Sequence, residues 1–112
     1  MPIGSIIPWH KNLTNTPNLP DGWAECSGQT LNDPDSAYNN QVMPNLNGNN
    51  QFLRGSASSG NTGGSTQHTH SFTQHLYSDY APDASHETTG STANQSSNIP
   101  PYMDIVWIIR VK

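Results

Sequence analysis

The feature that most restricts the fold of this chain is a long polar segment between two more apolar ends. Residues 56–97 are almost entirely Ser, Thr, Asn, Gln, Gly and His, whereas apolar residues gather before this segment and in the last dozen positions. Because only 31% of the 112 residues are hydrophobic, a core can form only where the two ends meet. A core in a unit of about 70 residues seldom supplies more than about 3–5 kcal/mol, so a further stabilising element is expected.

The nature of that stabilising element is limited by the cysteine count. Cys26 is the only cysteine, so no disulfide can form within one chain. Metal binding, an oligomer interface or both are the remaining choices.

No basic segment followed by an apolar run comes after Met1, and no apolar stretch is long enough to span a bilayer, so neither a signal peptide nor a transmembrane segment is expected.

The charge of the chain argues against two classes of partner. The formal net charge is −4, and the basic side chains are few: Lys11, Arg54, Arg110 and Lys112. Nucleic-acid binding needs a basic stripe, and binding to anionic lipid needs a cationic face. We therefore expect no nucleic-acid partner and no membrane insertion.

Four short strands are predicted for the apolar ends. Residues 3–9 read as a strand that ends near Pro8, and residues 23–26 alternate apolar and polar side chains before a turn that leads into 29–31, which predicts a hairpin. Residues 105–112 are mostly β-branched or aromatic, which is typical of a central strand buried on both faces.

The central strand is expected to pair with residues 3–9 and to pack against Trp23, Leu46 and Phe52. Trp9 and Trp107 are assigned, with Trp23, to the core, because large aromatic side chains gain most from burial when apolar residues are scarce. Residues 32–43 are predicted to be loop.

The polar segment itself has no helical or strand periodicity, and three interpretations of it are open. Its composition is typical of a disordered chain. A long loop without regular structure can also carry a function. Alternatively, three copies could stack into a slender, hydrated stalk in which hydrogen bonds between chains replace a core.

Within this segment, His68 and His70 form a candidate metal pair. Side chains two residues apart on an extended backbone point to the same face, roughly 7 Å apart, so both imidazoles can reach one ion. The alternative is two solvated loop histidines, because His-x-His is a weak motif by itself. Two nitrogens do not complete the shell of a transition metal, but three chains around a threefold axis would supply six. No other histidine has a partner at ligand spacing, so we expect the remaining ones to be solvated: His10, His75 and His86.

The middle of the polar segment carries the aromatic side chains Phe72, His75, Tyr77 and Tyr80 among small polar residues. Rings supply contact area and amides or hydroxyls supply directional hydrogen bonds, a mixture suited to recognising carbohydrate or a surface protein. The other interpretation is that these rings pack against one another and close the stalk.

In the order of its motifs the chain resembles the bacteriophage tail collar domain, a module of tail-fibre tips. The resemblance rests on ordered blocks along nearly the whole chain: Gly4-Ser5-Ile6 and Trp9, Pro20-Asp21-Gly22-Trp23, Cys26-Ser27-Gly28-Gln29, Pro44-Asn45-Leu46-Asn47-Gly48, Phe52-Leu53-Arg54-Gly55-Ser56, Gly63-Gly64-Ser65 with His68-Thr69-His70, and Asn98-Ile99-Pro100-Pro101-Tyr102-Met103 with Trp107-Ile108-Ile109-Arg110.

The resemblance implies a mostly β fold with little helix in an intertwined homotrimer. A single domain, 1–112, would consist of a small collar core of short strands, 1–55 and 98–112, and a long irregular polar insert, 56–97, that projects from it. The resemblance also implies an ion on the trimer axis held by His68 and His70 of three chains. Iron is the ion of the best-known long-fibre tips, and zinc is reported in the family. Six imidazoles favour Fe(II), because structural zinc prefers four ligands.

The leading functional interpretation is a non-catalytic module of the virion tail fibre, assembled in the host cytoplasm. It would attach to host-cell surface carbohydrate or to an outer-membrane protein. A different interpretation is a structural trimerisation cap that makes no receptor contact. The third is a metal-dependent hydrolase that uses His68 and His70 with His75, His86 or Asp79, which requires an open coordination position and a general base.

Overall fold

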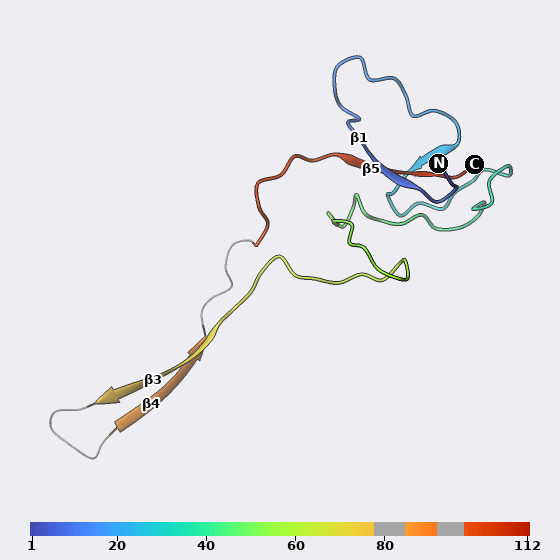
Figure 1. Cartoon of the computed structure of the whole chain (residues 1–112). Helices are drawn as coiled ribbons and strands as arrows, with labels where there is room; N and C mark the ends of the chain where they lie inside the picture. The colour runs from blue at the N-terminus through green and yellow to red at the C-terminus, as the bar shows by residue number, and fades with distance from the viewer. Residues whose placement is uncertain (78–84, 92–97) are drawn as a thin grey trace. The chain divides into compact units, whose positions relative to one another are not determined.

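The computed structural model describes the main chain of residues 1–77, 85–91 and 98–112, and the side chains in these ranges except at 74–77, 85–89 and 91. All regular elements of the described ranges are strands: β1 (Ile6–Trp9), β2 (Trp23–Glu25), β3 (Ser71–Tyr77), β4 (Ser85–Ser91) and β5 (Val106–Arg110). The mostly β character expected from the sequence is therefore confirmed (Figure 1). None of the described segments forms a helix long and apolar enough to cross a membrane.

The chain divides into two units. One unit contains residues 1–61 and 103–112, and the other contains residues 62–102. The expected organisation, a single domain with a collar core at 1–55 and 98–112, stays a prediction.

The first unit is built on a three-stranded antiparallel sheet in the order β1-β5-β2. Ile7 lies opposite Ile108 in the β1–β5 pair, and Ala24 lies opposite Ile109 in the β2–β5 pair. The expected central strand and its pairing with the first strand are confirmed. The sequence Val-Trp-Ile-Ile-Arg suits this place because β-branched and aromatic side chains pack well on a pleated surface.

Pro8 lies inside β1 although proline cannot donate a main-chain hydrogen bond. Its partner in the register is Trp107. Trp107 directs its hydrogen bonds toward the β2 side, where its carbonyl accepts from Cys26 at 2.9 Å and its N–H donates to Asn47 at 2.8 Å. No donor is needed at Pro8, and β1 is an edge strand of the sheet, which is the position where proline is tolerated.

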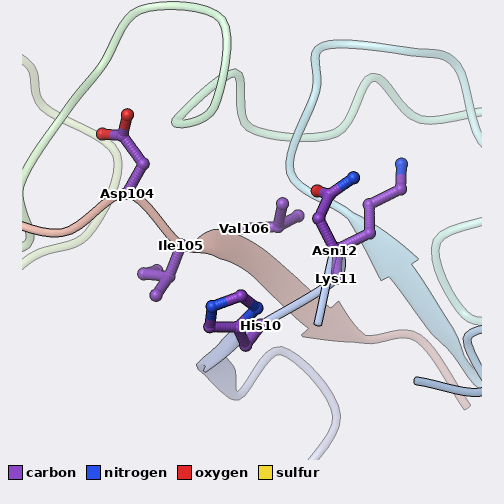
Figure 2. A pocket seen from close by; sticks show the side chains of 6 residues that line it. All are labelled: His10, Lys11, Asn12, Asp104, Ile105 and Val106. Carbon is purple, nitrogen blue, oxygen red and sulfur yellow. The ribbon is translucent and has the colours of Figure 1, made fainter. Parts of the chain in front are cut away.

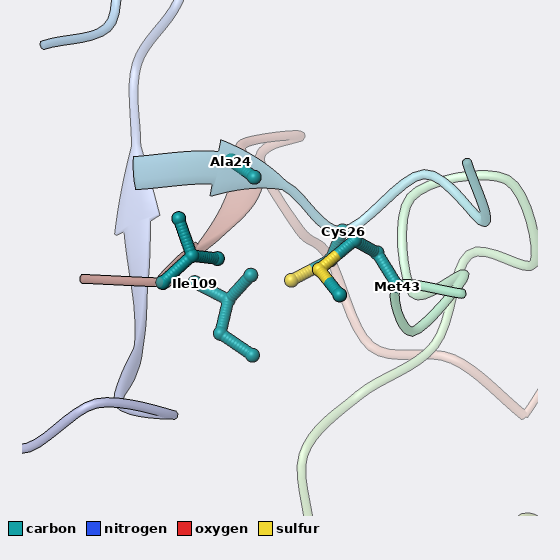
Figure 3. Close-up of a cluster of buried hydrophobic side chains, with 5 residues drawn as sticks. Ala24, Cys26, Met43 and Ile109 are labelled. Atoms are coloured by element: carbon teal, nitrogen blue, oxygen red, sulfur yellow. The ribbon is translucent and has the colours of Figure 1, made fainter. Parts of the chain in front are cut away.

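The core on one face of this sheet is small. It consists of five buried side chains: Ala24, Cys26, Met43, Ile109 and Val111 (Figure 3). Five partly buried side chains pack around them: Ile6, Leu31, Tyr38, Leu46 and Trp107. The side chain of Ile108 is buried on the opposite face of β5 from that of Ile109. The prediction that the central strand has buried side chains on both faces is therefore confirmed at these two residues.

Two expectations about the core are corrected. Phe52 is 66% exposed and does not belong to the core, although Leu46 does pack against it. The three tryptophans are only half-buried, and Trp107 is the one that packs against the core cluster. Aliphatic and sulfur-containing side chains fill the centre instead of aromatic rings.

The predicted hairpin between 23–26 and 29–31 is wrong. Residues 29–31 pair instead with 41–43, where Leu31 N–H donates to Gln41 O at 2.9 Å and Met43 N–H donates to Gln29 O at 2.8 Å. Gly28, at φ 77°, gives the physical reason, since this left-handed conformation turns the chain away from β2. The 32–43 loop prediction therefore holds only until the bridge between Thr30 and Val42.

The loop between these bridging segments is fixed to the end of β5 by polar contacts. The hydroxyl of the buried residue Ser36 donates to Val111 O, and the Lys112 ammonium lies 3.0 Å from the carboxylate of Asp21 and 3.1 Å from that of Asp33. We call Asp21, Asp33 and Lys112 the charge clamp. The charge clamp joins the turn before β2, which contains Asp21, and the loop that contains Asp33 to Lys112, which follows β5.

The second unit contains an antiparallel hairpin of β3 and β4, which the sequence did not predict. Ser71 lies opposite Ser91, and Tyr77 lies opposite Ser85. The expectation that 56–97 is irregular throughout is therefore wrong. Three of the seven residues of β3 are apolar or aromatic and β4 is mostly polar, so the sequence has no regular apolar alternation that marks both strands. The antiparallel register between β3 and β4 defines the hairpin.

Candidate metal-binding histidine pair

His68 and His70 lie immediately before β3 in the second unit, and both are exposed. Their ring centres are 4.9 Å apart and their ring planes are inclined by 85°. The extended backbone expected from the sequence thus brings the two imidazoles onto one side. The two imidazole rings are close enough for both to contact one ligand.

The segment before the histidines is held by local hydrogen bonds. The Ser65 hydroxyl accepts from Gln67 N–H at 3.2 Å and donates to Gln67 O at 2.8 Å, which closes a tight turn. Thr66 O accepts from Asn98 N–H at 2.8 Å. This last bond links the segment that leads into β3 with the segment that follows β4, so the histidines lie at the base of the hairpin.

The distance between the rings fits a shared metal ion. With metal–nitrogen bonds of roughly 2.1 Å, two imidazoles in adjacent coordination positions have ring centres about 4.5–5.3 Å apart. The observed 4.9 Å lies in this range. An edge-to-face pair of aromatic rings has a similar spacing, so the same geometry also suits direct ring contact.

No third ligand joins this pair within the part of the chain that the structure describes, where no group of three or more His, Cys, Asp or Glu side chains could hold a metal. His10 is exposed and belongs to the first unit. His75 lies in β3 and His86 in β4, but their side chains are outside the described residues. Two imidazoles from one chain leave a shell that needs further ligands.

Among the candidate receptor-contact residues, Phe72 is the one whose side chain the structure describes. It is 48% exposed and lies opposite Gly90. A Cβ atom at Gly90 would meet the Phe72 ring at 2.8 Å, so the ring lies over the glycine. His75 and Tyr77 belong to β3 with undescribed side chains, and Tyr80 lies outside the described residues.

A shallow hollow of about 130 Å³ in the first unit was not expected from the sequence (Figure 2). Its lining comes from two segments that are far apart in the chain: His10, Lys11, Asn12, Asp104, Ile105 and Val106. The Lys11 ammonium is engaged by Glu25 at 2.6 Å. No sequence pattern indicates this hollow, because only the pairing of β1 with β5 brings the two segments together.

Comparison with protein-family models, curated proteins and solved structures found no match for this chain.

Proposed function

We propose that this chain is a non-catalytic attachment module of a bacteriophage tail fibre that works as a homotrimer clamped by a metal ion. The observation that supports the proposal best is the exposed histidine pair, with ring centres 4.9 Å apart at the base of a hairpin. Such a pair can share an ion but cannot complete its shell. Three copies around an axis supply six nitrogens, which suits Fe(II), with zinc as the other candidate.

The size of the core also supports association between copies. Few side chains of the first unit are buried, whereas several large apolar ones are exposed, among them Phe52 at 66% and Met103 at 75%. A unit with so small a core gains stability when such side chains are covered by neighbouring chains. The same neighbours would place their histidine pairs around one axis.

The proposed partner is the host-cell surface, either its carbohydrate or an outer-membrane protein. Phe72, His75, Tyr77 and Tyr80 would form the contact surface on the hairpin, with rings for area and polar neighbours for direction. The proposed location is the virion tail fibre, after assembly in the host cytoplasm. Neither nucleic acid nor membrane insertion is part of this function.

The proposal is tested by the mass of the purified protein in solution, its metal content and its adsorption to host cells. We expect a trimeric mass, one ion for every three chains, and reduced adsorption for Tyr77→Ala with Tyr80→Ala while the trimer persists. A well-ordered monomer without metal would refute the metal-clamped trimer. Unchanged adsorption of the double variant would exclude these tyrosines as the contact surface.

The second candidate function is a structural trimerisation cap without receptor contact. The position of the Phe72 ring over Gly90 favours it, because this ring is already used within the hairpin. Binding of the isolated trimer to whole cells distinguishes the two functions. An attachment module binds directly, whereas a cap binds only when joined to another fibre protein.

A further inference from the structure

Asn47 and Gly48 form the one Asn-Gly step in the sequence, which is the dipeptide most prone to deamidation. In this reaction the main-chain nitrogen of the following residue attacks the side-chain carbonyl carbon of asparagine. Glycine favours the attack because it leaves the nitrogen unhindered and the backbone free to adopt the cyclic geometry. The structure determines whether both reacting groups are available.

The carboxamide of Asn47 takes part in three hydrogen bonds. Its oxygen accepts the N–H of Trp107 at 2.8 Å, and its nitrogen donates to Trp107 O at 3.1 Å and to Ser27 Oγ at 3.2 Å. The main-chain N–H of Asn47 donates to Cys26 O at 3.0 Å, which fixes the backbone from which the side chain extends. Rotation of the carboxamide toward Gly48 breaks the contacts with the central strand.

The attacking nitrogen is also engaged. Gly48 N–H donates to the side-chain oxygen of Asn45 at 3.1 Å, and Asn49 N–H donates to Asn45 O at 3.2 Å. A Cβ atom at this position would meet the Asn45 side-chain oxygen at 2.5 Å, so a larger residue here would displace the carboxamide that accepts the Gly48 N–H. In the folded turn both reacting groups of the dipeptide are therefore hydrogen-bonded to other residues.

We propose that Asn47 is a deamidation site that the native fold closes and that unfolding opens. In the unfolded chain Gly48 N loses its proton and bonds to Asn47 Cγ, the bond from Cγ to the amide nitrogen breaks, and ammonia leaves with a proton. Water then opens the five-membered imide at either carbonyl. The product is an aspartyl or isoaspartyl residue at this position, with no oxidant or reductant involved.

The product cannot restore the native contacts. A carboxylate has no hydrogen to donate to Trp107 O or to Ser27 Oγ, and the isoaspartyl form adds a main-chain carbon that shifts the turn. Deamidation thus converts a chain that unfolds into one that refolds poorly. This inference is independent of the proposed function.

The experiment compares the full chain, folded in buffer and unfolded in urea, at the same mildly alkaline pH and temperature. Peptide mass mapping follows the conversion of Asn47, with Asn12, which precedes the bulky residue Leu13, as the internal control. We expect conversion in the folded chain to be at least about tenfold slower, because it must first open the contacts with Trp107. Equal rates in the two states would overturn the proposal.

The variant Asn45→Ala tests the part assigned to Gly48. It removes the acceptor of the Gly48 N–H, so we expect faster conversion in the folded state and an unchanged rate in urea. Circular dichroism checks that the variant is folded. An unchanged folded-state rate would show that this hydrogen bond does not contribute to the protection.

Discussion

The side chain of Asn47 pairs with the main chain of Trp107 as a neighbouring strand would. The Trp107 N–H donates to Asn47 Oδ1 at 2.8 Å, and Asn47 Nδ2 donates back to Trp107 O at 3.1 Å. β2 ends at Glu25, one pair short of Trp107, so the carboxamide continues the hydrogen-bonding pattern of β5 beyond the last residue of β2. An isolated loop residue thereby completes the sheet.

Replacing Asn47 by aspartate is expected to destabilise the first unit. The substitution keeps the shape but removes the donor and places a carboxylate oxygen beside Trp107 O. The expected loss is about 1–3 kcal/mol of unfolding free energy, measured by urea denaturation. Asn49→Asp is the matched control, because it adds the same charge at an exposed position two residues away. Equal losses in the two variants would contradict the role of the pairing.

Cys26 is expected to be inert in the folded protein. It is fully buried, and burial raises the pKa of its thiol to about 11. An unfolded cysteine has a pKa near 8.5, so at about pH 8 the folded chain carries roughly two orders of magnitude less thiolate. Alkylation by iodoacetamide should be negligible in buffer and rapid in urea. Rapid labelling of the folded chain would show that the core around Cys26 opens readily.

The charge clamp predicts how stability depends on pH. The hydrogen bond from Lys112 lowers the pKa of Asp33, and the amide of Asp35 acts in the same direction. The hydrogen bonds to Asp21 and Asp33 raise the pKa of Lys112. The contribution of the clamp is therefore present between the unfolded values of about 3.9 and 10.4, and it is lost as the pH falls or rises beyond them through the shifted folded values.

Urea midpoints measured across this pH range test the clamp. Asp33→Asn should remove the acid-side loss that Asp33 causes, whereas Asp35→Asn, a change at an exposed neighbour, should leave it in place. The effect is expected to be modest, because ion pairs that solvent reaches are screened by salt. Identical pH profiles for the unmodified chain and Asp33→Asn would contradict the assignment.

Metal binding by His68 and His70 predicts loss of the ion in acid. Imidazole binds a metal only when neutral, so the metal content of the purified protein should fall as the solution is acidified. His68→Ala and His70→Ala should each lose the metal, and His10→Ala should retain it, as read by elemental analysis. A metal content that is the same in all three variants would rule out the histidine pair as the site.

The first unit could be predicted from the sequence only where apolar residues mark it. The run from Ile105 to Val111 identified the central strand and its pairing with β1. The partner of residues 29–31 could not be predicted, because the choice between β2 and 41–43 depends on the conformation of Gly28 and on contacts with distant residues. Phe52 was misassigned, since an apolar side chain does not reveal whether the sheet is wide enough to cover it.

The site was predictable to the same limited degree. Spacing alone placed His68 and His70 on one side of the chain, and their 4.9 Å separation agrees with this. The hairpin of β3 and β4 had no apolar alternation to mark it, and the hollow beside His10 is made by segments from opposite ends of the chain. Patterns of apolar residues do not report such arrangements.

The strand order β1-β5-β2 determines when this sheet can form during synthesis on the ribosome. Ile7 and its partner Ile108 are about a hundred residues apart in the sequence. β1 and β2 each pair with β5 and do not pair with each other. A nascent chain that lacks β5 therefore exposes two unpaired strands. The sheet can be completed only after β5 has been synthesised and enters between them.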